Sequence, residues 1–304
     1  MDSQPVVVLA GGLLIGFVFG SVGLLSGFCV VSGLRNHING DGRMIRTIAL
    51  AVAVAILGTQ ALSAFGYVDL SKSIYLAPSF SAPVVLLGGL LFGYGMIAAN
   101  ACASRTMVLL GRGNLRSLVV IATIGITAQM TLKGLIAPLR IALVNASQTT
   151  FGTVSLPALL THSGLTPSLA AAIAAVIVAA AFLIFAFSHA RFRASTLLVV
   201  SGLIMGLLVP AGWFITGFLG NDPFTPTPVA SLTFIAPLAD SLQYVMLSTG
   251  STLNFGIVVM AGVLLGSFIT AVVTRRFELE GYKSHNHMLR SIGGAARMGV
   301  GGVM

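Results

Sequence analysis

Residues 88–102 read GGLLFGYGMIAANAC, an apolar stretch that holds four glycines and ends on one of the two cysteines of the chain. It lies in an apolar run at 83–110, which is longer than the roughly 20 residues that cross a bilayer. Glycine inside a helix costs about 1 kcal/mol relative to alanine, so the cluster needs a reason. Two reasons are open: close helix packing, as in Gly89/Gly93, and a broken helix whose freed N–H groups face a cavity. The run at 6–33 is also Gly-rich and longer than a bilayer requires, and the excess length of both runs favours broken or re-entrant helices.

The composition of the whole chain predicts the same environment. Its 304 residues have a mean hydropathy of +1.01, and only 8% of them are charged. Soluble domains carry about 25% charged residues, so an all-α polytopic membrane protein is predicted, embedded in a lipid bilayer. The net charge of +9 comes from scattered Lys and Arg without an aromatic-interleaved patch, so no nucleic-acid partner is expected.

Seven apolar runs are predicted as membrane spans, and an eighth begins near residue 291. The seven are 6–33, 46–66, 83–110, 117–136, 168–188, 196–219 and 253–274. Arg and Lys gather in the loops 35–46, 111–116, 189–193 and 275–290, which the positive-inside rule places in the cytoplasm. This topology predicts a multi-pass membrane protein with its N-terminus on the outer side of the membrane.

Two connecting segments are harder to interpret. The segment 220–252 is expected to be an outer loop, because the prolines of NDPFTPTP at 221–228 exclude a helix there. The linker 137–167 is long and partly apolar, and an interfacial or re-entrant helix is expected in it.

Pairs of similar segments predict an internal repeat. GLLIGFVFGSVGLLSGF at 12–28 resembles GLIMGLLVPAGWFITGF at 202–218, and the Gly-rich 88–96 has a counterpart at 293–302. The paired spans run in opposite directions, as in transporters built from inverted repeats, although Gly-Leu-rich helices also match by chance. The expected division is a first repeat at 1–145, a linker at 146–167 and a second repeat at 168–304. The last apolar segment stops in mid-helix, so the chain is expected to be truncated at its C-terminal end.

The membrane spans offer little conventional chemistry. All seven acidic residues lie outside the spans or at their edges, and His285 with His287 is too weak a ligand set for a metal. No catalytic group, metal or cofactor is therefore predicted. The N-terminus of a half-helix, in contrast, binds anions. The candidate substrate-path residues at the Gly-rich segments are Cys29, Cys102, Asn100, Ser104, Gly93, Gly95 and Ser26.

Arg105 follows this cluster and has two open interpretations. It either snorkels to the cytoplasmic end of its span or favours a reactive thiolate at Cys102. Kept as a thiol, Cys102 could instead donate a weak S–H hydrogen bond to an anionic substrate.

The motifs GGLLFGYGMIAANACAS and GRGNLRSL within 88–118, together with SGFCVVSGLR at 26–35, resemble the YeeE/YedE family of inner-membrane proteins for sulfur-compound uptake. The chain departs from the family pattern at Ala101 and Arg105, where glycine is usual. The resemblance implies thiosulfate uptake across the bacterial inner membrane through an hourglass of inverted repeats, with Cys29 and Cys102 along the path. The outer N-terminus would then be periplasmic. A third path cysteine would follow about four residues after Met304.

The expected function is therefore transport of a small sulfur-containing anion, most simply thiosulfate, without enzymatic activity. The family often works with a small soluble sulfur-carrier protein, which the resemblance implies as a partner. Three alternatives stay open: a membrane sulfurtransferase that relays a persulfide, a transporter of selenium compounds, and a scaffold with incidental cysteines.

Overall fold

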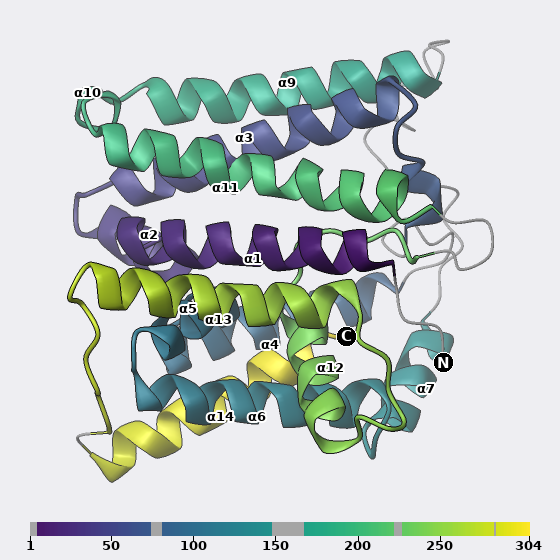
Figure 1. Cartoon of the computed structure of the whole chain (residues 1–304), viewed down its shortest axis with the longest axis vertical. Coiled ribbons are helices and arrows are strands. Elements are labelled where there is room, and N and C mark those ends of the chain that lie inside the picture. Colours follow the sequence, from purple (N-terminus) through teal and green to yellow (C-terminus); the bar gives the residue numbers. More distant parts are fainter. Residues whose placement is uncertain (1–4, 74–80, 148–166, 222–226, 283) are drawn as a thin grey trace. The chain divides into compact units, whose positions relative to one another are not determined.

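The regular structure of the protein is helical in the residues that the structure describes. The computed structural model describes residues 5–73, 81–147, 167–221, 227–282 and 284–304, and its regular elements there are helices (Figure 1). In these ranges, seven helical segments are long and apolar enough to cross a membrane, and they match the predicted spans to within a few residues. The prediction of an all-α polytopic membrane protein is confirmed.

Two of the seven segments are divided into a long and a short helix by non-helical residues. In chain order the elements are α1 (Val6–Ser26), α2 (Val30–Ile38), α3 (Arg43–Ala64), η1 (Leu70–Lys72), α4 (Ala82–Ala99), α5 (Ala103–Gly111), α6 (Leu115–Leu132), α7 (Ala137–Ala146), α9 (Pro167–Phe187), α10 (Ala190–Arg193), α11 (Thr196–Phe214), the π-helical η3 (Ile215–Leu219), α12 (Ile235–Met246), α13 (Phe255–Val273) and α14 (His285–Gly301). The broken helices expected from the excess length of two spans are therefore present, as α1–α2 and α4–α5.

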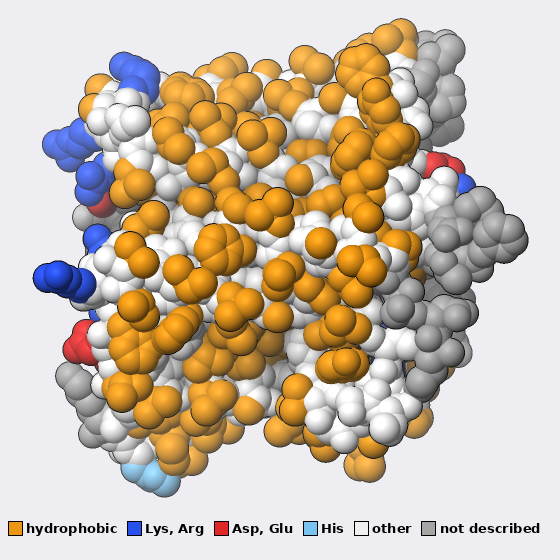
Figure 2. All heavy atoms as spheres, viewed as in Figure 1, with side chains coloured by type: hydrophobic (Ala, Val, Ile, Leu, Met, Phe, Trp, Pro, Cys, Tyr) orange, Lys and Arg blue, Asp and Glu red, His pale blue; other side chains and the backbone are white. Residues whose placement is uncertain are grey.

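The chain forms two compact units. The first contains Met1–Val31, Phe80–Thr149 and Thr233–Met304, and the second contains Ser32–Ser79 and Thr150–Leu232. Hydrophobic side chains cover the visible lengths of the helices, and Lys and Arg lie near helix ends (Figure 2). Exposed residues such as Leu86 (67%), Leu90 (65%) and Ile184 (72%) are apolar, as expected of surfaces that face lipid.

In the first unit, α1 and α13 lie side by side in the same direction (Figure 1). A Cβ atom at Gly16 would overlap the carbonyl oxygen of Val259, and one at Gly20 would overlap that of Val263. Gly262 faces α1 in the same way. Only glycine lets the two backbones come this close, which is the small-residue packing of membrane helices.

The other close helix pair of the first unit is α4 with α14, which run antiparallel. Gly88 faces the carbonyl oxygen of Gly301, and Gly95 faces that of Gly294. The interface uses glycines seven residues apart on both helices. The expected packing of Gly89/Gly93 is wrong, because a Cβ at either position would meet no atom within 4 Å.

The second unit contains α3, α9 and α11, with α10 joining the last two. A Cβ atom at Gly202 would lie 2.9 Å from the carbonyl oxygen of Thr47, and one at Gly206 would lie 2.7 Å from that of Ala51. Leu50 and Phe192 are fully buried beside these contacts. Close glycine packing of two parallel helices therefore occurs in this unit too.

Two segments between spans contain helices. The linker 137–167 holds α7, while residues 148–166 lie outside the described part of the chain. The interpretation of 220–252 as a loop is wrong at α12, although the described residues 227–230 are not helical and 222–226 lie outside the described part. One face of α12 is buried at Ile235, Leu238 and Ala239, and Pro237 is tolerated because it lies in the first turn.

Candidate functional site

The first helix break places Cys29 directly before α2. Helix α1 ends at Ser26, and Gly27 takes a left-handed conformation with φ of +71°. The N–H group of Gly27 donates to the carbonyl oxygen of Gly23 (3.1 Å), which closes the last turn of α1. The chain then turns through Phe28 and Cys29 into α2, so Cys29 lies beside the N-terminus of a new helix.

The second break places Cys102 in the equivalent position before α5. Helix α4 ends at Ala99, and Asn100 is left-handed with φ of +58°, a conformation that asparagine tolerates better than most residues. Cys102 is the N-cap residue of α5, and its carbonyl oxygen accepts hydrogen bonds from the backbone N–H (2.9 Å) and the side-chain hydroxyl (2.8 Å) of Thr106.

The two breaks meet at their cysteines. The Sγ atoms of Cys29 and Cys102 lie 3.7 Å apart, and the side chains are only 2% and 6% exposed. This separation fits a hydrogen bond between two thiols, because a disulfide would need about 2.05 Å. Two residues 73 positions apart thus form a buried thiol pair between the ends of four half-helices.

One polar side chain contacts the thiol pair, and two others lie in the helical turns beside the breaks. The hydroxyl of Ser104 lies 3.3 Å from the sulfur of Cys102, and Nη1 of Arg105 donates to the carbonyl oxygen of Gly23 at 2.9 Å. The buried hydroxyl of Ser26 donates to the carbonyl oxygen of Val22 (2.7 Å), within its own helix. Of the predicted path residues, Cys29, Cys102 and Ser104 are therefore in direct contact.

The other predicted path residues lie elsewhere along α4. Gly95 packs against α14, and Gly93 has open space where a Cβ would be. Asn100 lies at the break itself and is exposed. Asn100 also lines a cavity to which residues of α6 and α14 contribute.

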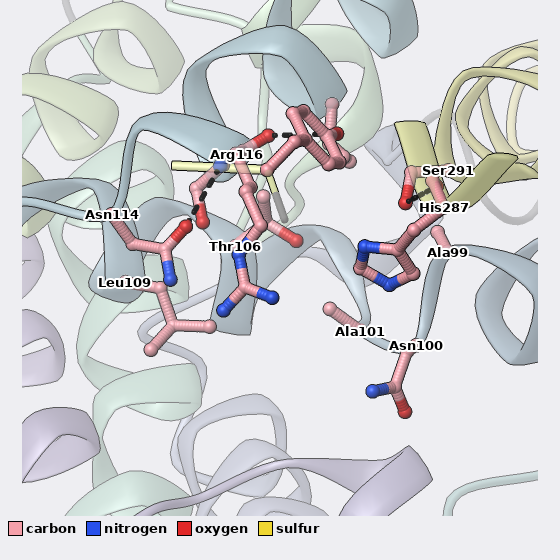
Figure 3. Close-up of a pocket in the computed structure, with 12 residues that line it drawn as sticks. Ala99, Asn100, Ala101, Thr106, Leu109, Asn114, Arg116, His287 and Ser291 are labelled. Carbon is pink, nitrogen blue, oxygen red and sulfur yellow. Dashed lines mark hydrogen bonds between the residues drawn. The ribbon is translucent and has the colours of Figure 1, made fainter. Parts of the chain in front are cut away.

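This cavity has a volume of about 120 Å³, room for several water molecules. Figure 3 shows Arg116 and His287 pointing into it from two sides, with Ala101 between them. The lining residues are Ala99, Asn100, Ala101, Thr106, Leu109, Asn114, Arg116, Ser117, Val120, Tyr282, His287 and Ser291.

A clamp of ion pairs lies at one edge of the cavity. Glu280 accepts hydrogen bonds from Arg116 and from Asn114 (both 2.7 Å), and its backbone pairs with the start of α6. Arg112 reaches Glu278 at 3.3 Å. The segment after α13 is thereby held against the α5–α6 turn.

The cavity was not predicted from the sequence. Its walls come from three parts of the chain that only tertiary packing brings together. Two of its lining residues stood out in the sequence: Asn100 is a predicted path residue, and Asn114 stands in the motif GRGNLRSL at 111–118.

Broken helices within apolar spans, with polar groups buried at the breaks, are features of membrane transporters. A model of the Sulphur transport family matches residues 25–304, which contain both cysteines. The chain belongs to this family, so it is a multi-pass membrane protein for the transport of sulfur compounds, and the resemblance seen at 26–35 and 88–118 is confirmed. It is similar to the thiosulfate transporter TsuA of Escherichia coli (strain K12), with 22% identity over 317 residues that cover 97% of this chain and 83% of that protein.

Proposed function

We propose that this chain carries thiosulfate inward across the bacterial inner membrane, with its N-terminus in the periplasm. The observation that carries the proposal is the buried contact between Cys29 and Cys102 at the two helix breaks. The similarity to a thiosulfate transporter supports the choice of substrate.

The thiols suit the outer sulfur of thiosulfate. In the structure, one thiol donates its proton to the other sulfur. An arriving anion replaces this contact and accepts S–H hydrogen bonds, which are weak. Weak, successive contacts favour passage, because a transported ion must leave each site as readily as it enters.

The half-helices supply a positive environment without a metal. Helices α2 and α5 each begin directly after a path cysteine, and unpaired backbone N–H groups and the positive dipole end lie at such N-termini. Broken helices of this kind bind anionic groups in other transporters. They compensate part of the charge of a sulfur oxyanion in a segment that lipid surrounds.

The internal repeat belongs to the same proposal. Gly12 and Gly16 of α1 face carbonyl oxygens four residues apart on α13, and Gly202 and Gly206 of α11 face carbonyl oxygens four residues apart on α3. These glycines match in the predicted repeat, which supports two inverted halves. The clamp at Glu280 would then lie on the cytoplasmic side, where a soluble sulfur-carrier protein could receive the transported sulfur compound.

Uptake of ³⁵S-thiosulfate by cells that lack their own thiosulfate transporter tests the proposal. Expression of the full chain is expected to restore uptake and growth on thiosulfate as the sole sulfur source. Competition by unlabelled thiosulfate, sulfite, sulfate and selenosulfate then ranks the substrates. Cells that insert the protein but take up no label would contradict thiosulfate transport.

The 3.7 Å distance between the sulfurs also favours a second candidate, a persulfide relay. In that reaction a cysteine thiolate takes the outer sulfur of thiosulfate and sulfite leaves. Mass spectrometry of the protein after incubation with thiosulfate separates the two functions. Transport leaves the mass of the Cys102 peptide unchanged, whereas a relay adds one sulfur atom to it.

Filling the cavity is expected to block the path beyond the thiols. Leu109 lines the cavity and is half-buried, so Leu109→Trp places an indole ring in a space of about 120 Å³. Most uptake should be lost while insertion into the membrane is kept. Leu110→Trp is the matched control, because the neighbouring Leu110 does not line the cavity. Equal uptake by the two variants would show that the anion does not pass through this space.

A further inference from the structure

Arg105 is an unusual residue for its place in the fold. It lies in the first turn of α5, inside the membrane span Ala82–Gly111. A cation near a helix N-terminus opposes the helix dipole, and an ionised side chain within a span is costly. A residue that carries both costs calls for a functional explanation.

The contacts of Arg105 exclude snorkelling to the end of the span. Its Nη1 atom donates to the carbonyl oxygen of Gly23, in the last turn of α1, at 2.9 Å. Six residues separate it from Gly111 at the end of α5, about 9 Å along the helix axis. The guanidinium therefore points across to the first helix break.

No carboxylate balances this charge in the described part of the chain. The ion pairs found there join Arg43 to Asp41, Arg112 to Glu278, Arg116 to Glu280 and Lys133 to Asp240. The carbonyl of Gly23 orients the guanidinium but cannot neutralise it. Positive charge is thus left at the point where the two breaks meet.

The charge lies close to the thiol pair. Cys102 is the N-cap residue of α5, and Arg105 follows it by three residues, within the first turn of that helix. Gly23, which accepts from Arg105, also accepts from Gly27, two residues before Cys29. One guanidinium is therefore anchored between the two segments that carry the path cysteines.

We propose that Arg105 is the countercharge of the transported anion and makes the site prefer divalent sulfur oxyanions to monovalent ones. This inference rests on the proposed transport function and names the charge class of its substrate. The guanidinium lowers the energy of a doubly charged anion beside the thiols more than that of a singly charged one. It acts through charge, while the thiols recognise sulfur.

The test compares thiosulfate with methanethiosulfonate, an anion that has the same outer sulfur but one charge. Competition against ³⁵S-thiosulfate uptake gives the preference of each variant. Arg105→Gln keeps an N–H donor for Gly23 and removes the charge, and Arg105→Lys keeps the charge and removes the planar group. The preference for thiosulfate over methanethiosulfonate is expected to fall about tenfold or more in Arg105→Gln. A tenfold change corresponds to only a modest part of the interaction energy of two unit charges a few ångströms apart. The preference is expected to persist in Arg105→Lys, which keeps the charge.

Each other outcome is decisive. An unchanged preference in Arg105→Gln would overturn the role of Arg105. Equal loss for both anions in both variants would assign Arg105 a structural role and also overturn it. If a variant transports too slowly to measure, the shift in melting temperature of the purified protein with each anion gives the same preference. Wild-type protein that takes up neither anion would contradict the proposed function itself, which separates the two failures.

Discussion

Replacing Cys102 by alanine is expected to lower the initial rate of thiosulfate uptake about 10-fold. A hydrogen bond to a charged group contributes about 1.5–3 kcal/mol, and the weak S–H donor lies at the lower end of this range. The thiol is 6% exposed and touches both Cys29 and Ser104, so no neighbouring water replaces it directly. Uptake of ³⁵S-thiosulfate by cells that contain equal amounts of inserted protein measures the effect. Cys102→Ser keeps a hydroxyl donor and is expected to fall between wild type and Cys102→Ala.

Val108→Ala is the matched control for the cysteine variant. Val108 is 1% exposed on the same helix, and its truncation removes buried volume without touching a sulfur atom. If Cys102→Ala transports no worse than Val108→Ala, the thiol has no special role in the path. Because the two thiols contact each other, Cys29→Ala and Cys102→Ala should combine non-additively in the double variant.

Gly95→Ala is expected to destabilise the protein by about 1–3 kcal/mol, the typical cost of an added methyl group in a packed interface. Its Cβ would lie 2.6 Å from the carbonyl oxygen of Gly294 and 2.7 Å from the side chain of Met298. Neither the backbone oxygen nor helix α14 can yield without separating from α4. A lower melting temperature of the purified protein in detergent measures the effect.

Gly93→Ala provides the comparison on the same helix. Its Cβ would meet no atom within 4 Å, and alanine favours the helix by about 1 kcal/mol over glycine. The melting temperature is therefore expected to stay the same or to rise. Equal destabilisation by both substitutions would contradict the packing of α4 on α14. Normal uptake by Gly93→Ala would in addition remove Gly93 from the predicted path.

The sequence predicted the spans well because each is a long apolar run. It also predicted that 6–33 and 83–110 are broken, since both are longer than a bilayer requires. The positions of the breaks were not predictable in the same way. Asn100 adopts a left-handed conformation where glycine is the usual choice, and nothing in its immediate neighbours marks it.

The elements that were missed depend on tertiary packing. Helix α12 has only 12 residues, and polar residues such as Asp240 and Gln243 interrupt its apolar residues. A search for long apolar runs therefore does not detect it. The cavity combines residues near 100, 116 and 287, which no sequence pattern links. The 3.7 Å contact of the cysteines is of the same kind: the sequence placed each at a Gly-rich segment, and only the fold brings them together.

The burial of both cysteines makes the native protein its own conformational probe. The chain has only two cysteines, and both lie at the meeting point of the helix breaks, 2% and 6% exposed. Within residues 1–304, a water-soluble maleimide therefore has a single place to react. The rate of maleimide modification reports how often the helix breaks open to solvent. The thiol pair therefore allows this opening to be measured without introducing a cysteine.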